Sequence, residues 1–409
     1  MTAASCFRVQ SAVSEHPDTL EAIKEILARL DVQAGQPSFV TIHYGADRPA
    51  DEVWRYASEA LGCDALHGGS SCLGVMSEEG PAISSGRAIG AFAIWDPAGD
   101  YGTASAPLGS SPRAAAAMAT RNALRAARRA GEAPDLVWMT SAPGHEEEVL
   151  EGIKEVIGSP ALIVGASAAD NDVTGKWSQI SRDGVTSDAV VVSVLFPSTP
   201  LGCSFESGYA PTGERGQVTR ADGRMLAEIN GRPAADVYAE WTGLAARPNE
   251  GCLSILSEAS MHPLGRVSSE IDGIPFFILA HPASVHSDGR IELFADIAEG
   301  DEVWVMETSE ATLVERAGRI AEASRSQLPG GDLTGGLMVY CGGCMLSVAH
   351  RVDEIVSGVS EALAHAPFLV VFSFGEQGET VCSDSEHGNL MISCISFGVS
   401  EAGDGERGR

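Results

Sequence analysis

The sharpest local pattern in this sequence is Cys341-Gly-Gly-Cys344. A CxxC pair can be redox-active, or it can supply half of a metal site. A structural zinc site usually needs a second ligand pair at suitable spacing, and only Cys382 and His387 lie near in the sequence. Two loop cysteines that bind no metal are the simpler interpretation. The sequence has no CxxCH pattern for covalent haem attachment.

A second group of polar residues surrounds the last Gly-rich loop, from Glu376 through His387 to Asn389. This segment lies between two apolar stretches, so we expect it to be exposed or to line a cleft. His387 is a candidate ligand contact or axial haem ligand, and a solvated histidine is the simpler alternative. Asp170 and Asn171 follow an earlier apolar stretch in the same way, where capping of a turn is the alternative role.

Three stretches of the chain repeat one plan, which is strand, polar loop, amphipathic helix, strand, Gly-rich loop and strand. The stretches begin at Ser38, Asp135 and Gly335 and close with apolar runs near Gly86, Ser187 and Asn389. Glycine lets backbone amides approach a ligand closely, and loops held on a rigid scaffold are where small-molecule sites form. The recurrence therefore predicts a pocket built from loops.

Each repeat presents its Gly-rich loop directly after an apolar strand, at residues 67–74, 164–172 and 372–379. Backbone amides and hydroxyls there could clamp a carboxylate or another polar head group, although a tight turn needing positive φ is the alternative. None of the loops matches a phosphate-binding motif. The candidate ligand contacts are Gly69, Ser70, Ser71, Gly165, Ser167, Asp170, Asn171, Cys341, Cys344, Gly375, Glu376, His387 and Asn389.

The predicted fold class is α/β, in the mixed α+β sense, with two lobes of mixed sheets flanked by helices. The strand–helix–strand repeats favour parallel pairs. Three apolar runs between residues 273 and 308 predict an antiparallel meander, with His281 in a solvated turn. We expect a first domain over 1–245, a second over 246–398 and a disordered tail over 399–409.

The composition narrows the class of protein. The chain has 27 basic and 56 acidic residues and a formal net charge of -29, which argues against nucleic-acid binding and anionic membrane surfaces. Its nine cysteines lie mostly in apolar strands or beside glycines, as buried thiols do in a reducing cytoplasm. No signal peptide is evident, and no run reaches the roughly 18 apolar residues of a membrane span. We expect a cytoplasmic protein.

From about residue 38 to residue 398 the chain resembles FIST-domain proteins, which are bacterial sensory modules with paired N-terminal and C-terminal FIST regions. The motifs that carry the resemblance are HGGSSCLGVMSEEG at 67–80, VGASAADND at 164–172, SDAVVV at 187–192, VTRADGRMLAEINGRPAADVY at 218–238, VYCGGC at 339–344, and FSFGEQGE with HGNLMISC at 372–394. Cys344 stands where the family tends to have an Arg in a CxxR-like pattern.

The resemblance implies small-ligand sensing, with amino acids as the expected ligand class. It also implies a signalling partner, such as a histidine kinase or a cyclic-dinucleotide enzyme. Chains holding only the two FIST regions are also similar to nitric-oxide-sensing haemoproteins that regulate a histidine kinase. His387 would then be the haem ligand.

Three functions are therefore open: a non-enzymatic sensor, a haem-based sensor, and a cysteine-dependent or metal-dependent enzyme. We favour the sensor without a catalytic, metal or cofactor site, because the Gly-rich loops recur and no convincing catalytic constellation is present.

Overall fold

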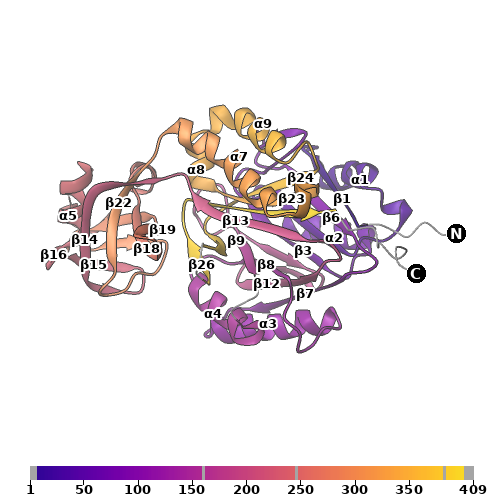
Figure 1. The fold of residues 1–409 in the computed structure, drawn as a ribbon, viewed down its shortest axis with the longest axis horizontal. Helices are drawn as coiled ribbons and strands as arrows, with labels where there is room; N and C mark the ends of the chain where they lie inside the picture. Colours follow the sequence, from indigo (N-terminus) through magenta and orange to yellow (C-terminus); the bar gives the residue numbers. More distant parts are fainter. Residues whose placement is uncertain (1–6, 159–161, 245–246, 381–383, 400–409) are drawn as a thin grey trace.

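The computed structural model describes residues 7–158, 162–244, 247–380 and 384–399 (Figure 1). Its fold is α/β, with mixed parallel and antiparallel sheets flanked by helices, which confirms the predicted class. A large core carries both ends of the chain, and a smaller lobe lies to the left in Figure 1. The expected disordered tail lies outside the described residues, apart from Val399.

The core consists of three units with one order of elements: strand, helix, strand, helix, strand, β-hairpin and strand. Unit 1 contains β1 (Arg8–Ser14), α1 (Thr19–Arg29), the short 3-10 turn η1 (Val32–Ala34), β2 (Phe39–Gly45), α2 (Ala50–Leu61), β3 (Leu66–Ser71), β4 (Val75–Ser77), β5 (Gly80–Ala82) and β6 (Ile89–Trp95). Unit 2 contains β7 (Asp100–Pro107), α3 (Pro112–Ala126), β8 (Leu136–Ser141), α4 (Glu146–Ile157), β9 (Leu162–Ser167), β10 (Gln179–Ser181), β11 (Gly184–Thr186) and β12 (Ala189–Phe196). Unit 3 contains β13 (Leu201–Ser207), α7 (Glu310–Ser326), η2 (Pro329–Gly331), β23 (Leu333–Cys341), α8 (Gly342–Ser347), η3 (Ala349–Arg351), α9 (Val352–Ala362), β24 (Phe368–Ser373), β25 (Glu376–Glu379), β26 (Ser385–Gly388) and β27 (Met391–Gly398).

The sequence repeat corresponds to a repeated strand pairing. In each unit the second and third strands are parallel, as in β2 with β3, β8 with β9, and β23 with β24. The last strand of each unit returns antiparallel beside the second. The parallel pairs predicted from the strand–helix–strand pattern are thus confirmed, and the equivalent ends of β3, β9 and β24 are Ser71, Ser167 and Ser373.

Each unit contributes its hairpin to the sheet of a neighbouring unit. The hairpin β4–β5 of unit 1 pairs with β24, β10–β11 of unit 2 pairs with β3, and β25–β26 of unit 3 pairs with β9. This cyclic exchange gives the core an approximate threefold arrangement. Because no unit completes its six-stranded sheet alone, the three units form one interleaved body.

The smaller lobe is inserted into unit 3 between β13 and α7, and we call it the inserted lobe (residues 208–309). It contains β14 (Ala210–Asp222), β15 (Met225–Ile229), β16 (Arg232–Pro233), α5 (Ala234–Thr242), β17 (Cys252–Ser254), α6 (Leu256–Ala259), β18 (Leu264–Ile271), β19 (Ile274–Ala280), β20 (Pro282–His286), β21 (Ile291–Leu293) and β22 (Glu302–Glu307). Its strands form a nine-stranded sheet.

The predicted meander between residues 273 and 308 is wrong. The strand β19 pairs with β18, and β22 lies between β14 and β18. Among the four strands β19 to β22, only β20 and β21 are neighbours both in sequence and in the sheet. Turn residues show where strands end but do not show which strands pair.

Apolar patterning places the core strands and helices. All seven residues of β2 and all eight residues of β12 are buried, as expected for strands covered on both faces. The helix α4 buries Val149, Ile153 and Ile157 along one face, and its first turn holds three glutamates, which suit the positive end of the helix dipole. Among the helices in the described part of the chain, none is long and apolar enough to cross a bilayer.

Candidate functional site

A cavity of about 420 Å³ opens between the inserted lobe and unit 3. From the inserted lobe it is bordered by the segment around α6, by His281 and by Phe294. Unit 3 contributes Cys341, residues of α8, Phe374 and Asn389, and Val173 comes from the loop of unit 2. The site is therefore built from two lobes, and loop tips of two repeats reach it.

Asn389 borders the cavity and has a polar atom without a hydrogen-bond partner. It is 2% exposed, and its Oδ1 accepts a hydrogen bond from the His281 backbone N–H at 3.1 Å. Its Nδ2 is buried and has no hydrogen-bond partner in the structure. A buried donor left without an acceptor costs about 1–3 kcal/mol. The residue that carries this donor borders the cavity.

His281 presents a neutral imidazole beside Asn389. Its Nε2 lies 2.9 Å from the Leu256 carbonyl oxygen, so Nε2 carries the proton and Nδ1 is left as an acceptor. Burial lowers the pKa of His281 to about 4, against a smaller opposing effect of the hydrogen bond to Leu256. The expectation that His281 lies in a solvated turn is wrong, since the residue is 4% exposed.

Cys341 forms part of the cavity wall as a protonated thiol. A hydrogen bond with Cys344, and then burial, raise the pKa of Cys341 well above its ordinary value. Behind it, burial and the neighbouring thiol raise the pKa of Glu376 well above the usual range. The Ser373 hydroxyl donates to Glu376 Oε1 at 2.5 Å, and the Met391 N–H donates to Oε2 at 2.9 Å. A protonated thiol is a poor nucleophile and a poor metal ligand.

Cys344 is held away from the lining of the cavity. Its side chain is buried, and its Sγ lies 3.6 Å from the Tyr209 hydroxyl, which donates to the Ser260 carbonyl at 2.7 Å. The CxxC pair therefore gives this wall its shape. The groups that shift the pKa of Cys341 include no cation that would favour its thiolate.

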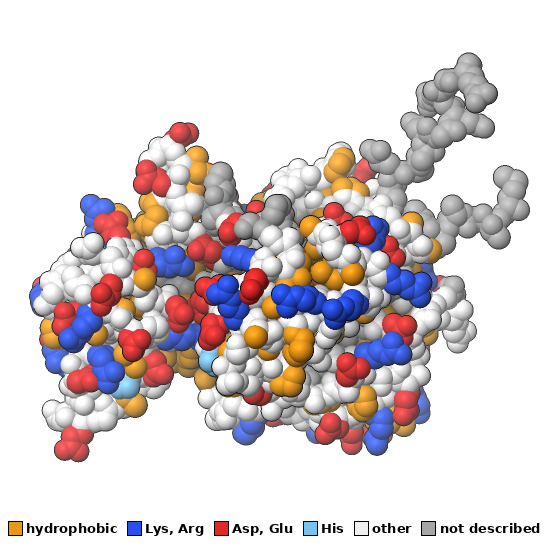
Figure 2. Space-filling view, turned by 90° about the horizontal axis from the view of Figure 1, so that it is seen from below, with side chains coloured by type: hydrophobic (Ala, Val, Ile, Leu, Met, Phe, Trp, Pro, Cys, Tyr) orange, Lys and Arg blue, Asp and Glu red, His pale blue; other side chains and the backbone are white. Residues whose placement is uncertain are grey.

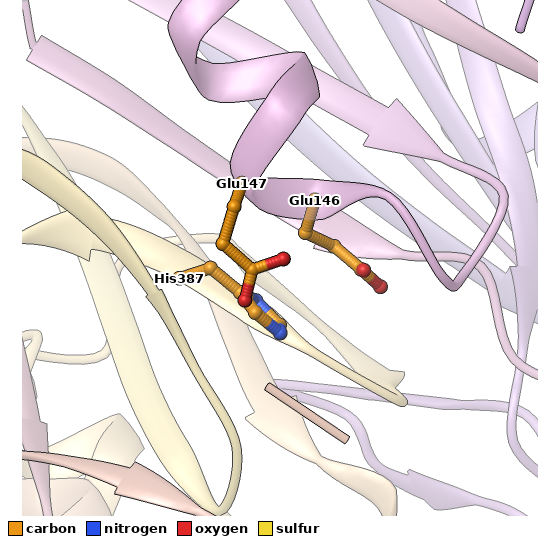
Figure 3. A group of neighbouring side chains, drawn as sticks. All are labelled: Glu146, Glu147 and His387. Atoms are coloured by element: carbon orange, nitrogen blue, oxygen red, sulfur yellow. The ribbon is translucent and has the colours of Figure 1, made fainter. Parts of the chain in front are cut away.

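A charged cluster joins the inserted lobe to the core next to the cavity. The Arg224 Nη2 lies 2.5 Å from Glu146 Oε2 and 2.8 Å from Glu147 Oε2. Figure 3 shows Glu147 and His387 pointing toward one another, from the start of α4 and from β26. The ligand atoms of Glu146, Glu147 and His387 lie within 4.8 Å of one another, which would suit a metal ion. The Arg224 guanidinium already supplies the positive charge there, so we assign no metal to this cluster.

Glu146 is ionised despite being buried. Burial alone raises the pKa of Glu146, but the nearby His387 ring, the charge of Arg224 and the hydrogen bonds from Ser167 and Arg224 bring it to about 2. The Ser167 hydroxyl donates to Glu146 Oε1 at 2.6 Å. The cluster opens onto a groove lined by Glu147, Arg266, Asp296 and Glu386. Figure 2 shows side chains of both charges gathered where the inserted lobe meets the core.

His387 does not fit the role of an axial haem ligand in this arrangement. Its Nε2 lies 3.3 Å from the Phe294 carbonyl oxygen, and its Nδ1 lies 3.2 Å from Gln377 Nε2. Both ring nitrogens are therefore already in contact with protein groups. Binding of iron would require the ring to leave these partners, and we derive no step through haem.

Most of the predicted loop residues join the units to one another. The Ser70 hydroxyl oxygen accepts the Ser178 N–H at 3.0 Å, and the Ser71 hydroxyl oxygen accepts the Phe372 N–H at 2.8 Å. The Ser167 N–H donates to the Gly375 carbonyl at 2.8 Å. Each of these bonds crosses from one unit to the next. The loop tips therefore meet, and their hydroxyls and amides serve the interlocking of the core.

The remaining loop residues also have partners within the protein. The Asp170 carboxylate accepts hydrogen bonds from backbone N–H groups at positions 172, 173, 174 and 176, so it caps its own turn. The Asn171 Oδ1 accepts the Leu73 N–H at 2.7 Å. A Cβ at Gly69 would lie 2.8 Å from the Thr140 side chain, and one at Gly165 would lie 2.3 Å from the Met139 side chain. These two glycines permit close packing of strands.

Of the predicted site residues, Cys341 and Asn389 border the cavity. Sequence reasoning missed His281, Phe294 and the segment around α6, because no short motif marks them. The available signal was weak: His281 ends an apolar run and precedes a proline, which is also typical of an ordinary turn.

Comparison with known families shows which family the chain belongs to. A model of the FIST N domain matches residues 38–232, and a model of the FIST C domain matches residues 234–379. Together these cover most of the sequence, so the chain belongs to the FIST family. FIST domains are a sensory type associated with small ligands.

Individual similar proteins give little further information about the function of this chain. An uncharacterized protein of Methanocaldococcus jannaschii is 32% identical over 95 residues, which is 23% of this chain and 18% of that protein. A cyanuric acid hydrolase from A. caulinodans aligns over 96% of this chain and 99% of its own, with 11% identity and a TM-score of 0.35. T. maritima PurL complexed with ATP aligns over 74% of this chain and 72% of its own, with 10% identity and a TM-score of 0.22. At such scores neither structure bears on function.

Proposed function

We propose that this protein is a non-enzymatic sensor whose small ligand binds in the cavity between the inserted lobe and unit 3. The observation that carries the proposal is the composition of the cavity wall. It is mainly apolar and contains a few convergent polar groups, of which Asn389 has a buried donor without a partner. Ligand sites are commonly of this kind.

The position of the cavity suits signal transmission. Its walls come from two lobes that are connected by two chain crossings, from β13 to β14 and from β22 to α7. A ligand that contacts both walls stabilises the arrangement in which they are close. Because a ligand shifts a population only when it binds two conformations unequally, a two-walled site is suited to sensing.

The states of Cys341 and His281 at the cavity favour a sensor over an enzyme. Cys341 is a protonated thiol, and neutral His281 donates its one ring proton to a backbone carbonyl. The signal would pass to another chain in the cytoplasm, such as a histidine kinase or a cyclic-dinucleotide enzyme. Amino acids, the ligand class that the family resemblance implies, are the first set to screen.

The test is a thermal-shift screen of the full chain against amino acids and a broad metabolite library, repeated with Gly343→Leu. Gly343 borders the cavity, and a Cβ there meets Leu390 at 3.4 Å, an ordinary contact. The leucine should fill the cavity and abolish a ligand-induced shift. Gly358→Leu is the matched control, because Gly358 is also helical and a Cβ there has nothing within 4 Å. Shifts that survive Gly343→Leu, or a flat response from the whole library, would contradict the proposal.

A further inference from the structure

We propose that the ligand of this cavity is an uncharged molecule that carries an amide group, open-chain or cyclic, on an apolar body. This inference rests on the proposed function, since it takes the cavity to be the sensory site. It specifies the ligand's chemistry from the wall of the cavity.

The residues around the cavity disfavour a carboxylate as the head group of the ligand. Among the described residues that border it, none is Lys or Arg, and the one ionisable acid is Glu258 on the exposed rim. His281 is neutral, because burial lowers its pKa to about 4. Removing an ion from water is costly unless an opposite charge compensates it. A neutral head group avoids this cost.

Besides the hydroxyls of Ser254, Ser257, Ser260 and Ser347, the uncharged polar groups of the wall include a donor and an acceptor on two residues in contact. Asn389 Nδ2 is a donor with no partner, and His281 Nδ1 is an acceptor because Nε2 carries the proton. The two residues are fixed to each other by the hydrogen bond from the His281 N–H to Asn389 Oδ1. An amide presents the complementary pair, since its carbonyl accepts and its N–H donates.

The rest of the wall suits an apolar body. Phe294 and Phe374 border the cavity from the two lobes, and Leu256 and Leu346 add aliphatic surface. A volume of about 420 Å³ falls within the range of small-molecule sites. An aromatic or alicyclic amide would bury its ring against these side chains while its head group reaches Asn389 and His281.

The test compares matched probes on the full-length protein. Benzamide and benzoate have nearly the same shape and differ in the head group, and their dissociation constants can be measured by ligand-observed NMR. We expect benzamide to bind at least tenfold more tightly than benzoate, and Gly343→Leu to remove this binding. Asn389→Asp keeps the oxygen that accepts the His281 N–H and replaces the free donor, so it should weaken benzamide binding at least tenfold. The comparison of probes on the unmodified protein holds even if Asn389→Asp fails to fold.

The outcomes separate this inference from the proposed function. If benzoate binds as tightly as benzamide, or if a zwitterionic amino acid binds in the cavity and amides do not, the inference is wrong and the sensory proposal stands. If benzamide binds equally to Gly343→Leu, its site lies elsewhere and the inference fails. If neither the probes nor any library compound binds in a way that Gly343→Leu removes, both proposals fail together.

Discussion

The Arg224 guanidinium of the inserted lobe lies 2.5 Å from Glu146 Oε2 at the start of α4, and this ion pair links the two lobes. Glu146 is 2% exposed, and Arg224 also contacts Glu147 at 2.8 Å. The pair therefore holds the inserted lobe against unit 2, while contacts such as the hydrogen bond from the His281 N–H to Asn389 hold it against unit 3 beside the cavity.

Replacing Arg224 should destabilise the protein strongly. Arg224→Met leaves the buried Glu146 carboxylate without its cation, and breaking one partner of such a pair costs about 3–5 kcal/mol. Arg220→Met is the control, because Arg220 pairs with Glu228 at the surface of the same lobe, where a pair contributes about 1 kcal/mol or less. Urea unfolding measures both variants. Equal, small losses would show that Arg224 does not secure the interface.

Two equivalent serines should differ in their contribution to stability. Ser167 donates to ionised Glu146 at 2.6 Å, whereas Ser373 donates to Glu376, whose raised pKa keeps it protonated. A hydrogen bond to a charged group contributes about 1.5–3 kcal/mol, and one between neutral groups about 1 kcal/mol. Ser167→Ala should therefore lower the free energy of unfolding more than Ser373→Ala at pH 7. The reverse order would contradict the assigned charge states.

The buried Glu376 should make the protein less stable as pH rises. Its pKa is raised in the folded state, so the folded protein binds a proton that the unfolded chain releases above about pH 4.5. The free energy of unfolding is therefore highest below that pH. Above it, this free energy falls by about 1.4 kcal/mol per pH unit until the pKa of Glu376 in the folded protein is reached. The Glu376→Gln variant cannot ionise at this position. Its free energy of unfolding, relative to that of the unmodified protein, should therefore show no gain near pH 4 and a growing gain toward pH 8. A constant difference across this range would show that Glu376 is ionised in the folded protein.

The thiols should differ in reactivity. Cys341 is buried with a raised pKa, whereas Cys252 lies exposed on β17. Because the thiolate is the reactive form, iodoacetamide at pH 7.5 should label Cys252 at least about tenfold faster than Cys341 in the folded protein. Peptide mass spectrometry gives the two rates. Rapid labelling of Cys341 would reopen the cysteine-dependent enzyme as a function.

The repeated units could be predicted from the sequence because their signals are local. Apolar runs such as Val190–Leu195 and the amphipathic spacing of Val149, Ile153 and Ile157 are read within a short window. The hairpin exchange could not be predicted in this way. Residues 179–181 pair with His67, Gly68 and Gly69 of another unit, and nothing near either segment specifies that partner.

The candidate site was harder to predict than the fold, because it depends on long-range contacts. The sequence marks Asn389 only as a polar residue beside a loop, and its importance comes from a hydrogen bond to His281, 108 residues away. His281 is buried because β19 and β20 fold it into the nine-stranded sheet against α6. The Gly-rich loops were conspicuous for another reason, since Ser70, Ser71 and Ser167 interlock the units.

Hydrogen–deuterium exchange of the full chain, with and without a screened ligand, tests most directly whether the cavity between the inserted lobe and unit 3 is the sensory site. We predict slower exchange in two segments, 254–260 of the inserted lobe and 341–347 of unit 3, and no such protection in Gly343→Leu. Protection confined to other segments, or protection that persists in Gly343→Leu, would place the ligand outside this cavity.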